Sequence, residues 1–111
     1  MQMKRYVLGL DLVNDRKLIA EYEAYHAAVW PEVRAAIKDS GIYIMEIYRF
    51  ENRLFMLMEV DAGFSFEAKA KADARNPKVQ EWEQLMWKYQ QAIPGVKDGE
   101  KWVLMDKIFA L

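Results

Sequence analysis

The residues best suited to chemistry lie between Glu21 and Glu32, where the chain carries its only histidine, His26. Imidazole titrates close to neutral pH without a perturbing environment, so it can both accept and donate a proton there. Tyr22 precedes His26 by four residues, and residues four apart in an α-helix lie on the same face. The spacing therefore predicts a phenol and an imidazole that point to the same side of one helix.

The dipeptide Trp30-Pro31 follows one turn later and predicts a break in that helix. A proline ring clashes with the carbonyl four residues earlier, and it also disfavours helical geometry in the residue before it. His26 is therefore expected in the last turn before a break, where side chains often line the mouth of a pocket. A lone histidine is otherwise an ordinary core or surface residue, so the spacing alone leaves its role open.

Composition limits the classes of function. The 111 residues are 53% apolar and 30% charged, which predicts a single globular domain over residues 1–111. A formal net charge of −1, with basic and acidic residues interspersed, argues against a nucleic-acid partner, which needs a basic face. No apolar run approaches the roughly 20 residues of a membrane span, and the N-terminus lacks a signal-peptide pattern. We therefore expect a soluble, cytoplasmic protein without a membrane partner.

Metal and thiol chemistry are limited in the same way. The chain contains no cysteine, which excludes disulfides, thiolate nucleophiles and cysteine-ligated metals. Its single histidine also excludes multi-histidine sites, so only an all-oxygen metal site would remain. We expect no metal.

Hydrophobic periodicity predicts the elements that position these residues. We expect strands at 4–12, 42–50, 54–60 and 101–111, and helices at 17–28, 32–39, 66–75 and 77–91. Asn52 is expected to take the positive φ of the hairpin turn, and Lys69, Lys71 and Asp73 to form a solvated helix face. With right-handed crossovers, the order βαββαβ gives a four-stranded antiparallel sheet with helices on one face, the α+β ferredoxin-like plait.

The strands are too apolar for a single layer of helices. Residues 54–60 are apolar on both faces apart from Glu59, and residues 101–111 are strongly apolar. Helices of one chain cover only one face of a small sheet, and the other face would expose more apolar surface than a monomer tolerates. We expect a homodimer that packs these faces together or closes them into an α/β barrel.

The chain resembles the L-rhamnose mutarotase family over nearly its whole length. The most specific part is the run Tyr-x-x-x-His-x-x-x-Trp-Pro-Glu. The residues that carry the resemblance are Glu21-Tyr22, His26, Trp30-Pro31-Glu32, Gly41, Ile47-Tyr48, Leu54-Phe55, Glu59-Val60, Pro77, Val79-Gln80, Trp82 and Met86. The resemblance implies a ferredoxin-like dimer that interconverts the α and β anomers of a 6-deoxy monosaccharide without a cofactor.

The resemblance also implies roles for individual residues. The catalytic histidine of the family falls on His26, its sugar-binding tyrosine on Tyr22, and the first of two sugar-contacting tryptophans on Trp82. Tyr48 and Trp30 are further candidates for substrate contact, although Trp30 is equally suited to wedge the helix break. Trp82 also fits a core stripe, since it lies at helical spacing from apolar neighbours.

Two positions depart from the family pattern. Glu83 stands where the family has its second tryptophan, and Met45 stands where resembled members have a sugar-contacting tyrosine. Both lie where the sugar is expected, so the reaction carries over while the preferred sugar shifts from L-rhamnose, with L-fucose as the leading candidate. Glu83 also borders the apolar stripe of its helix and fits a solvated margin.

Two other classes of function remain open from the residues alone. A cofactor-independent monooxygenase or decyclase on the same dimeric plait would place His26 over an aromatic substrate in a wholly apolar cavity. A non-catalytic dimer that binds a small ligand would point His26 into packed core. An acid–base pair that converges on a polar pocket would favour the mutarotase.

Overall fold

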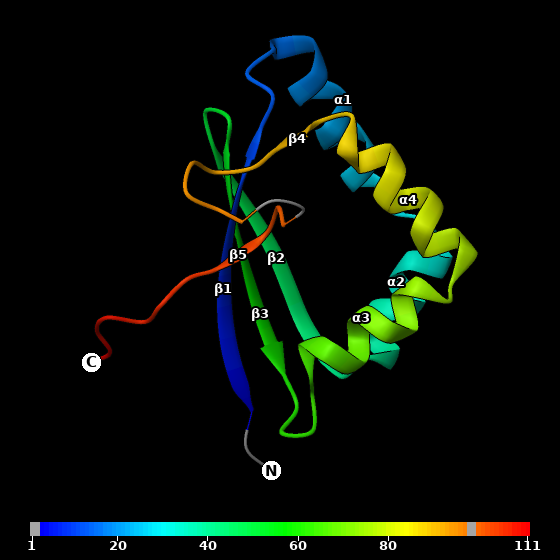
Figure 1. Ribbon diagram of the computed structural model, residues 1–111, viewed down its shortest axis with the longest axis vertical. Coiled ribbons are helices and arrows are strands. Elements are labelled where there is room, and N and C mark those ends of the chain that lie inside the picture. The colour runs from blue at the N-terminus through cyan, green and yellow to red at the C-terminus, as the bar shows by residue number, and fades with distance from the viewer. Residues whose placement is uncertain (1–2, 98–99) are drawn as a thin grey trace.

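The computed structural model describes residues 3–97 and 100–111, which form one antiparallel sheet with all helices on one side of it (Figure 1). The sheet order is β2-β3-β1-β4, and β5 also pairs with β1. In chain order the elements are β1 (Lys4–Leu12), α1 (Arg16–Ala27), α2 (Pro31–Asp39), β2 (Ile42–Phe50), β3 (Arg53–Val60), α3 (Phe66–Ala74), α4 (Pro77–Trp87), β4 (Gln90–Gln91) and β5 (Val103–Leu104).

The register of the central strands decides which side chains face the helices. β1 pairs with β3 from Lys4 opposite Val60 to Asp11 opposite Arg53. Alternate side chains point to opposite faces of a strand, so one set from each strand meets the helix layer. That set is buried and forms the sheet side of the core: Leu8, Leu10, Leu12, Leu54, Met56, Met58 and Val60.

The helices begin within one residue of the predicted positions, and side-chain caps satisfy the first backbone N–H groups of α1, α3 and α4. Asp15 Oδ1 accepts a hydrogen bond from Leu18 N at 3.1 Å, and Ser65 Oγ accepts one from Ala68 N at 3.2 Å. Pro31 occupies the first turn of α2, so the predicted break between α1 and α2 is confirmed. Gly41 ends this helical pair at φ 95°, a left-handed conformation that favours glycine.

The hairpin turn differs in detail from the prediction. Glu51, rather than Asn52, has the positive φ, at 53°. Asn52 is instead bonded to the end of β1. Its side-chain amide donates to Leu12 O at 3.0 Å, and its backbone carbonyl accepts from Leu12 N at 2.6 Å. A contact between residues so distant in sequence outweighs the local turn preference of asparagine.

The helix predicted at residues 77–91 ends earlier, at Trp87. The next residues leave the helix and pair with the end of β1, where Gln91 lies opposite Asp11 and Gln90 opposite Leu12. Tyr89 O accepts a hydrogen bond from Val13 N at 2.8 Å, and the Tyr89 ring is 2% exposed. Pairing with a strand edge and burial of an aromatic ring outweigh the helix propensity of Lys88, Gln90 and Gln91, because such propensities are small compared with tertiary contacts.

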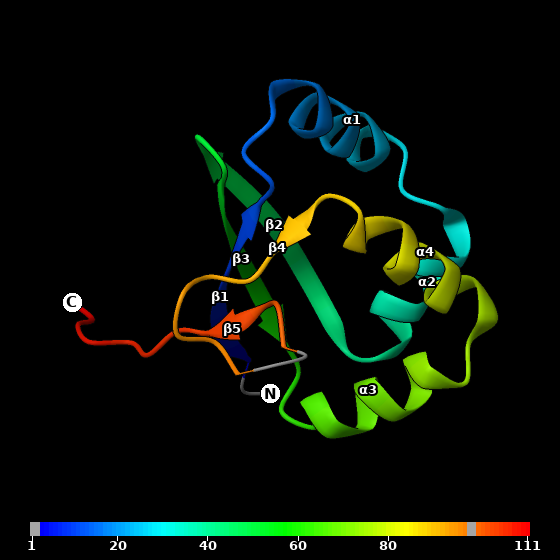
Figure 2. The ribbon, with the colours of Figure 1, turned by 45° about the horizontal axis from the view of Figure 1, so that its top comes forward.

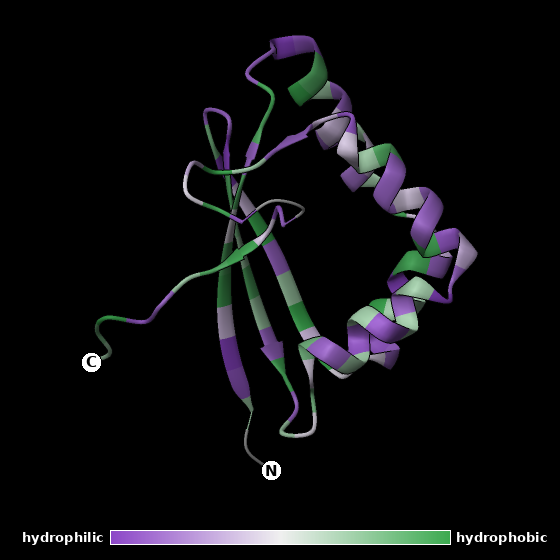
Figure 3. Cartoon of the chain, in the orientation of Figure 1, coloured by the Kyte–Doolittle hydropathy of each residue, from purple (hydrophilic) through white to green (hydrophobic). Residues whose placement is uncertain are grey.

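The strand predicted at residues 101–111 is also much shorter. Only Val103 and Leu104 pair with β1, and Met105 N adds one hydrogen bond to Val7 O at 2.8 Å. The chain then leaves the sheet as an extended segment, residues 105–111, that projects to the C-terminus (Figures 1 and 2). Apolar residues end this segment (Figure 3), but a strand needs a neighbour and β1 diverges from it there.

No helix among the described residues is both long and apolar enough to cross a membrane.

Candidate functional site

A cavity of about 470 Å³ lies between the helices and the sheet face that they cover. This volume is within the roughly 300–1,000 Å³ typical of small-molecule sites. Apolar side chains from β1, β2 and β3 form its floor, and α1 to α4 together with the segment around Lys101 form its walls. A few polar side chains interrupt this lining: Tyr22, His26, Lys69, Asp73, Glu83, Gln90 and Lys101.

His26 lies in the last turn of α1 and lines the cavity. Its Nδ1 is 2.8 Å from Tyr22 O. A carbonyl oxygen only accepts hydrogen bonds, so Nδ1 carries the proton and donates it. In the neutral ring Nε2 is then the unprotonated nitrogen, which is the form that accepts a proton from a substrate.

Burial favours this neutral form. It lowers the pKa of His26 below its ordinary value, and the hydrogen bond to the Tyr22 carbonyl offsets part of that shift. The imidazole is therefore uncharged at neutral pH. Its ring lies 4.2 Å from the Tyr22 ring and 5.5 Å from the Trp82 ring, measured between centroids, so it is held among aromatic neighbours.

Tyr22 shares a face of α1 with His26, as the four-residue spacing predicts. Its side chain is buried, yet it also lines the cavity. Burial raises the pKa of Tyr22, which keeps the phenol protonated and able to donate a hydrogen bond. The site thus combines a proton acceptor and a proton donor on adjacent turns of one helix.

Trp82 on α4 lines the cavity beside His26, although it is 8% exposed. Trp82 therefore combines the two roles considered from sequence: it packs in the core and it also borders the cavity. Trp30 lies behind it, with ring centroids 5.2 Å apart in an edge-to-face contact. Trp30 does not belong to the cavity lining, so it supports the site through Trp82.

Tyr48 lies away from the cavity of its own chain. It is on β2 opposite Phe55, on the sheet face that the helices do not cover, and 58% of its surface is exposed. Its hydroxyl donates to Glu46 Oε1 at 2.9 Å. Alternation along β2 places Met45 on the other face, where it pairs with Met58 and lines the cavity.

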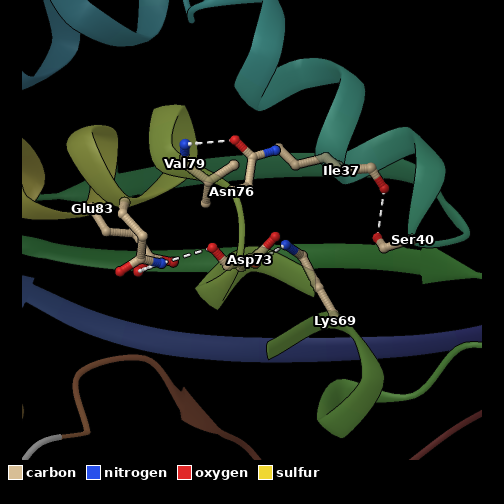
Figure 4. A network of polar contacts seen from close by, with 8 residues as sticks. Ile37, Ser40, Lys69, Asp73, Asn76, Val79 and Glu83 are labelled. Carbon is tan, nitrogen blue, oxygen red and sulfur yellow. Dashed lines mark hydrogen bonds and ion pairs between the residues drawn. The ribbon is translucent and has the colours of Figure 1, made fainter. Parts of the chain in front are cut away.

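Glu83 follows Trp82 on α4 and lines the cavity as well (Figure 4). Glu83 is an exposed residue at the margin of the cavity, where partial burial raises its pKa and the nearby charge of Asp73 raises it further. Gln80 Nε2 donates to Glu83 Oε2 at 3.3 Å, which orients the carboxyl group. The two residues that depart from the family pattern, Met45 and Glu83, therefore border the same space as His26.

Sequence reasoning missed four polar residues of this cavity: Lys69, Asp73, Gln90 and Lys101. Lys69 and Asp73 on α3 were predicted to be solvated, but their side chains are 20% and 14% exposed and line the cavity. Only Lys71 of the predicted solvated face is well exposed. The spacing of four residues between Lys69 and Asp73 indicates an ion pair. Charged residues occur on every side of α3, so the sequence does not show which side of this helix faces the core.

Within residues 3–97 and 100–111, no cluster of three or more His, Asp or Glu side chains is arranged to hold a metal ion.

The model of the L-rhamnose mutarotase family matches residues 5–111. The chain belongs to this family. An L-fucose mutarotase from Xanthomonas campestris is 48% identical over 113 aligned positions, which cover 100% of this chain and 90% of the relative. Family membership makes the chain an isomerase of the sugar mutarotase type and does not favour the monooxygenase and binding-dimer alternatives.

Solved structures agree on the fold of this mutarotase-family chain. The crystal structure of an L-rhamnose mutarotase from Formosa agariphila has a TM-score of 0.71 at 22% identity and covers 97% of this chain and 98% of its own. Tetracenomycin F2 cyclase from Streptomyces glaucescens has a TM-score of 0.58 at 20% identity, with 97% and 96% coverage. The predicted ferredoxin-like plait is confirmed.

Proposed function

We propose that this protein interconverts the α and β anomers of a 6-deoxyhexose, prefers L-fucose to L-rhamnose, and uses His26 for proton transfer. The observation that carries the proposal is the neutral imidazole of His26 on the cavity wall, with Nδ1 bound to the Tyr22 carbonyl and the Tyr22 phenol beside it. Such an arrangement offers an acceptor and a donor to one small molecule.

Anomer exchange needs only proton transfer. A base removes the proton of the anomeric hydroxyl while an acid protonates the ring oxygen, so the ring C–O bond breaks and a free aldehyde forms. Rotation about the adjacent C–C bond and the reverse transfers then close the opposite anomer. A well-positioned acid or base contributes typically 10²–10⁴-fold to such a step, and an imidazole is suited to both directions at neutral pH.

Five side chains of the cavity have a role in this scheme. His26 accepts the proton of the anomeric hydroxyl through Nε2, and Tyr22 donates a hydrogen bond to the ring oxygen or relays the proton. Trp82 and Met45 cover the apolar face of the sugar and its 6-methyl group. Glu83 accepts hydrogen bonds from ring hydroxyls, because a carboxylate is a pure acceptor.

The preference for L-fucose is supported by sequence similarity and by the two altered residues. The Xanthomonas relative, named an L-fucose mutarotase, is similar over the whole chain. Glu83 and Met45 replace two aromatic residues of the family pattern and line the cavity. L-Fucose and L-rhamnose differ in the orientation of their hydroxyl groups. A carboxylate at position 83 therefore changes which of the two sugars has all of its hydroxyls hydrogen-bonded.

A homodimer completes the proposal, and it acts on the free monosaccharide in the cytoplasm. The uncovered sheet face exposes Ile44, Tyr48 and Phe50 at 41%, 58% and 74%, and the segment after β5 exposes Ile108 and Phe109. Apolar surface of this kind is typical of an interface. Light scattering after size exclusion should give about twice the chain mass of 13.1 kDa, and Ile44→Lys should shift the protein to monomer. A wild type that stays monomeric at micromolar concentration would contradict the dimer.

Saturation-transfer NMR of anomer exchange tests the function directly. Irradiation of one anomeric proton should reduce the signal of the other only when the enzyme is present. We expect the largest acceleration with L-fucose, a smaller one with L-rhamnose, and the least with sugars that carry a 6-hydroxyl. Exchange at the uncatalysed rate for every sugar would contradict the proposed function.

A further inference from the structure

Helix α3 carries two ion pairs with the same spacing in different surroundings. Lys69 Nζ lies 2.5 Å from Asp73 Oδ2, and both side chains are largely buried in the cavity wall. Lys71 Nζ lies 3.6 Å from Glu67 Oε1 on the solvent side of the helix, where the side chains are 66% and 82% exposed. The Lys71–Glu67 pair is typical of a surface helix. The Lys69–Asp73 pair instead places two charges against a mostly apolar cavity.

Stability does not explain the inward pair. Removing two charges from water costs free energy that their attraction only partly offsets, so a buried ion pair is a weak stabiliser. An exposed pair would support the helix slightly without that cost. Few polar groups in an apolar cavity usually determine how a ligand is oriented, and Lys69 and Asp73 are positioned for that task.

The pair is fixed in place by its neighbours. Gln80 Nε2 donates to Asp73 O at 2.9 Å as well as to Glu83, so it joins the end of α3 to α4. The cap of α4 by Asn76 lies next to this contact, and Figure 4 shows the side chain of Lys69 meeting Asp73, with Glu83 on the opposite side of Asp73. A rigid arrangement of donor and acceptor is what discrimination between similar ligands requires.

The pair also lies far from the reacting end of the cavity. Figures 1 and 2 place α1, which carries His26, and α3 at opposite ends of the helix layer, with α4 between them. On α4, Trp82 contacts His26. The adjacent Glu83 is close enough to Asp73 and Lys69 for their charges to affect its pKa. A sugar whose anomeric carbon meets His26 therefore extends past Glu83 toward α3.

We infer that Lys69 and Asp73 are specificity-determining residues, a donor and an acceptor that together bind two neighbouring hydroxyls on the part of the sugar remote from the anomeric carbon. This inference rests on the proposed function. A lysine ammonium only donates and a carboxylate only accepts, while each sugar hydroxyl does both, so the pair matches a diol of one relative orientation. Glu83 supplies an additional acceptor between the pair and Trp82.

The variants Lys69→Met and Asp73→Asn test this inference, with Lys71→Met as the matched control on the same helix. Loss of a hydrogen bond to a charged group is expected to raise KM for the preferred sugar about tenfold to a hundredfold. The value of kcat should change less than threefold, because neither side chain touches the reacting atoms. Lys71→Met should keep the wild-type KM, and melting curves identify any variant that fails to fold.

Deoxy analogues of the preferred sugar give a readout that a purely structural role would not change. With wild type, the analogue that lacks the bound hydroxyl should show a raised KM. With Lys69→Met or Asp73→Asn, the same analogue should show no additional rise. Equal KM values in Lys69→Met and Lys71→Met, with wild-type exchange intact, would overturn the inference alone. A wild type without any catalysed exchange would overturn both the inference and the proposed function.

Discussion

Both faces of the sheet carry large apolar side chains, but their surroundings are opposite. One face packs against four helices and encloses the cavity with His26, Trp82 and Glu83. The other face exposes Tyr48, Phe50 and Ile44. The sequence of an apolar strand therefore does not reveal which of its two faces lines a site. Only the layer of helices that covers one face distinguishes the two.

The largest effect should come from the covered face. His26→Asn removes the proton acceptor but preserves a polar side chain that can still donate to the Tyr22 carbonyl. Catalysed anomer exchange is expected to fall about 10²–10⁴-fold, while circular dichroism and melting remain near wild type. Lys17→Gln on the exposed side of the same helix serves as the control. Exchange at the wild-type rate in His26→Asn would remove this residue from the mechanism.

The second prediction compares stability on the two faces. Leu54 is 2% exposed on the covered face, so Leu54→Ala should lower the free energy of unfolding by about 2–5 kcal/mol at every protein concentration. Ile44→Ala on the open face should destabilise the protein mainly at concentrations where the proposed dimer forms. Urea denaturation at several protein concentrations measures both. A concentration-independent loss of equal size in the two variants would show that the faces do not differ in this way.

The third prediction concerns sugar preference within the cavity. Glu83→Trp restores the aromatic residue of the family pattern and removes a carboxylate. The ratio of exchange rates on L-fucose and L-rhamnose should shift toward L-rhamnose, by about 1–3 kcal/mol for each hydroxyl that loses its partner. Gln84→Trp, at the neighbouring position outside the cavity lining, is the control. An unchanged ratio in Glu83→Trp would make Glu83 a bystander.

The smallest effect should appear in the pH dependence of stability. Because burial lowers the pKa of His26, the folded protein binds this proton less tightly than the unfolded chain does. The contribution of neutral His26 to the free energy of unfolding is fully present above about pH 6.5, the ordinary pKa of histidine. It decreases as the pH falls through that value and stops changing below the lowered pKa of the folded state. His26→Asn should lose this component of the pH profile, measured by urea denaturation. An identical profile in wild type and variant would contradict the burial of a neutral ring.

Local sequence signals determined much of the site. Tyr22 and His26 share a helix face because their spacing matches the helical repeat, and Trp30-Pro31 ends that helix because proline cannot continue it. Capping residues and Gly41 set other boundaries for the same reason, since their effects act within a few residues. The order of elements then allowed the plait to be predicted.

Contacts between distant segments decided the remainder. Residues 101–111 are apolar enough for a strand, yet only Val103 and Leu104 have a pairing partner on β1. Gln90 and Gln91 pair with β1 despite their helical surroundings in sequence. Lys69 and Asp73 have the spacing of a surface ion pair, and only the packing of α3 against α4 directs them into the cavity. Periodicity describes a segment by itself, whereas strand pairing and the orientation of a helix depend on what lies beside it.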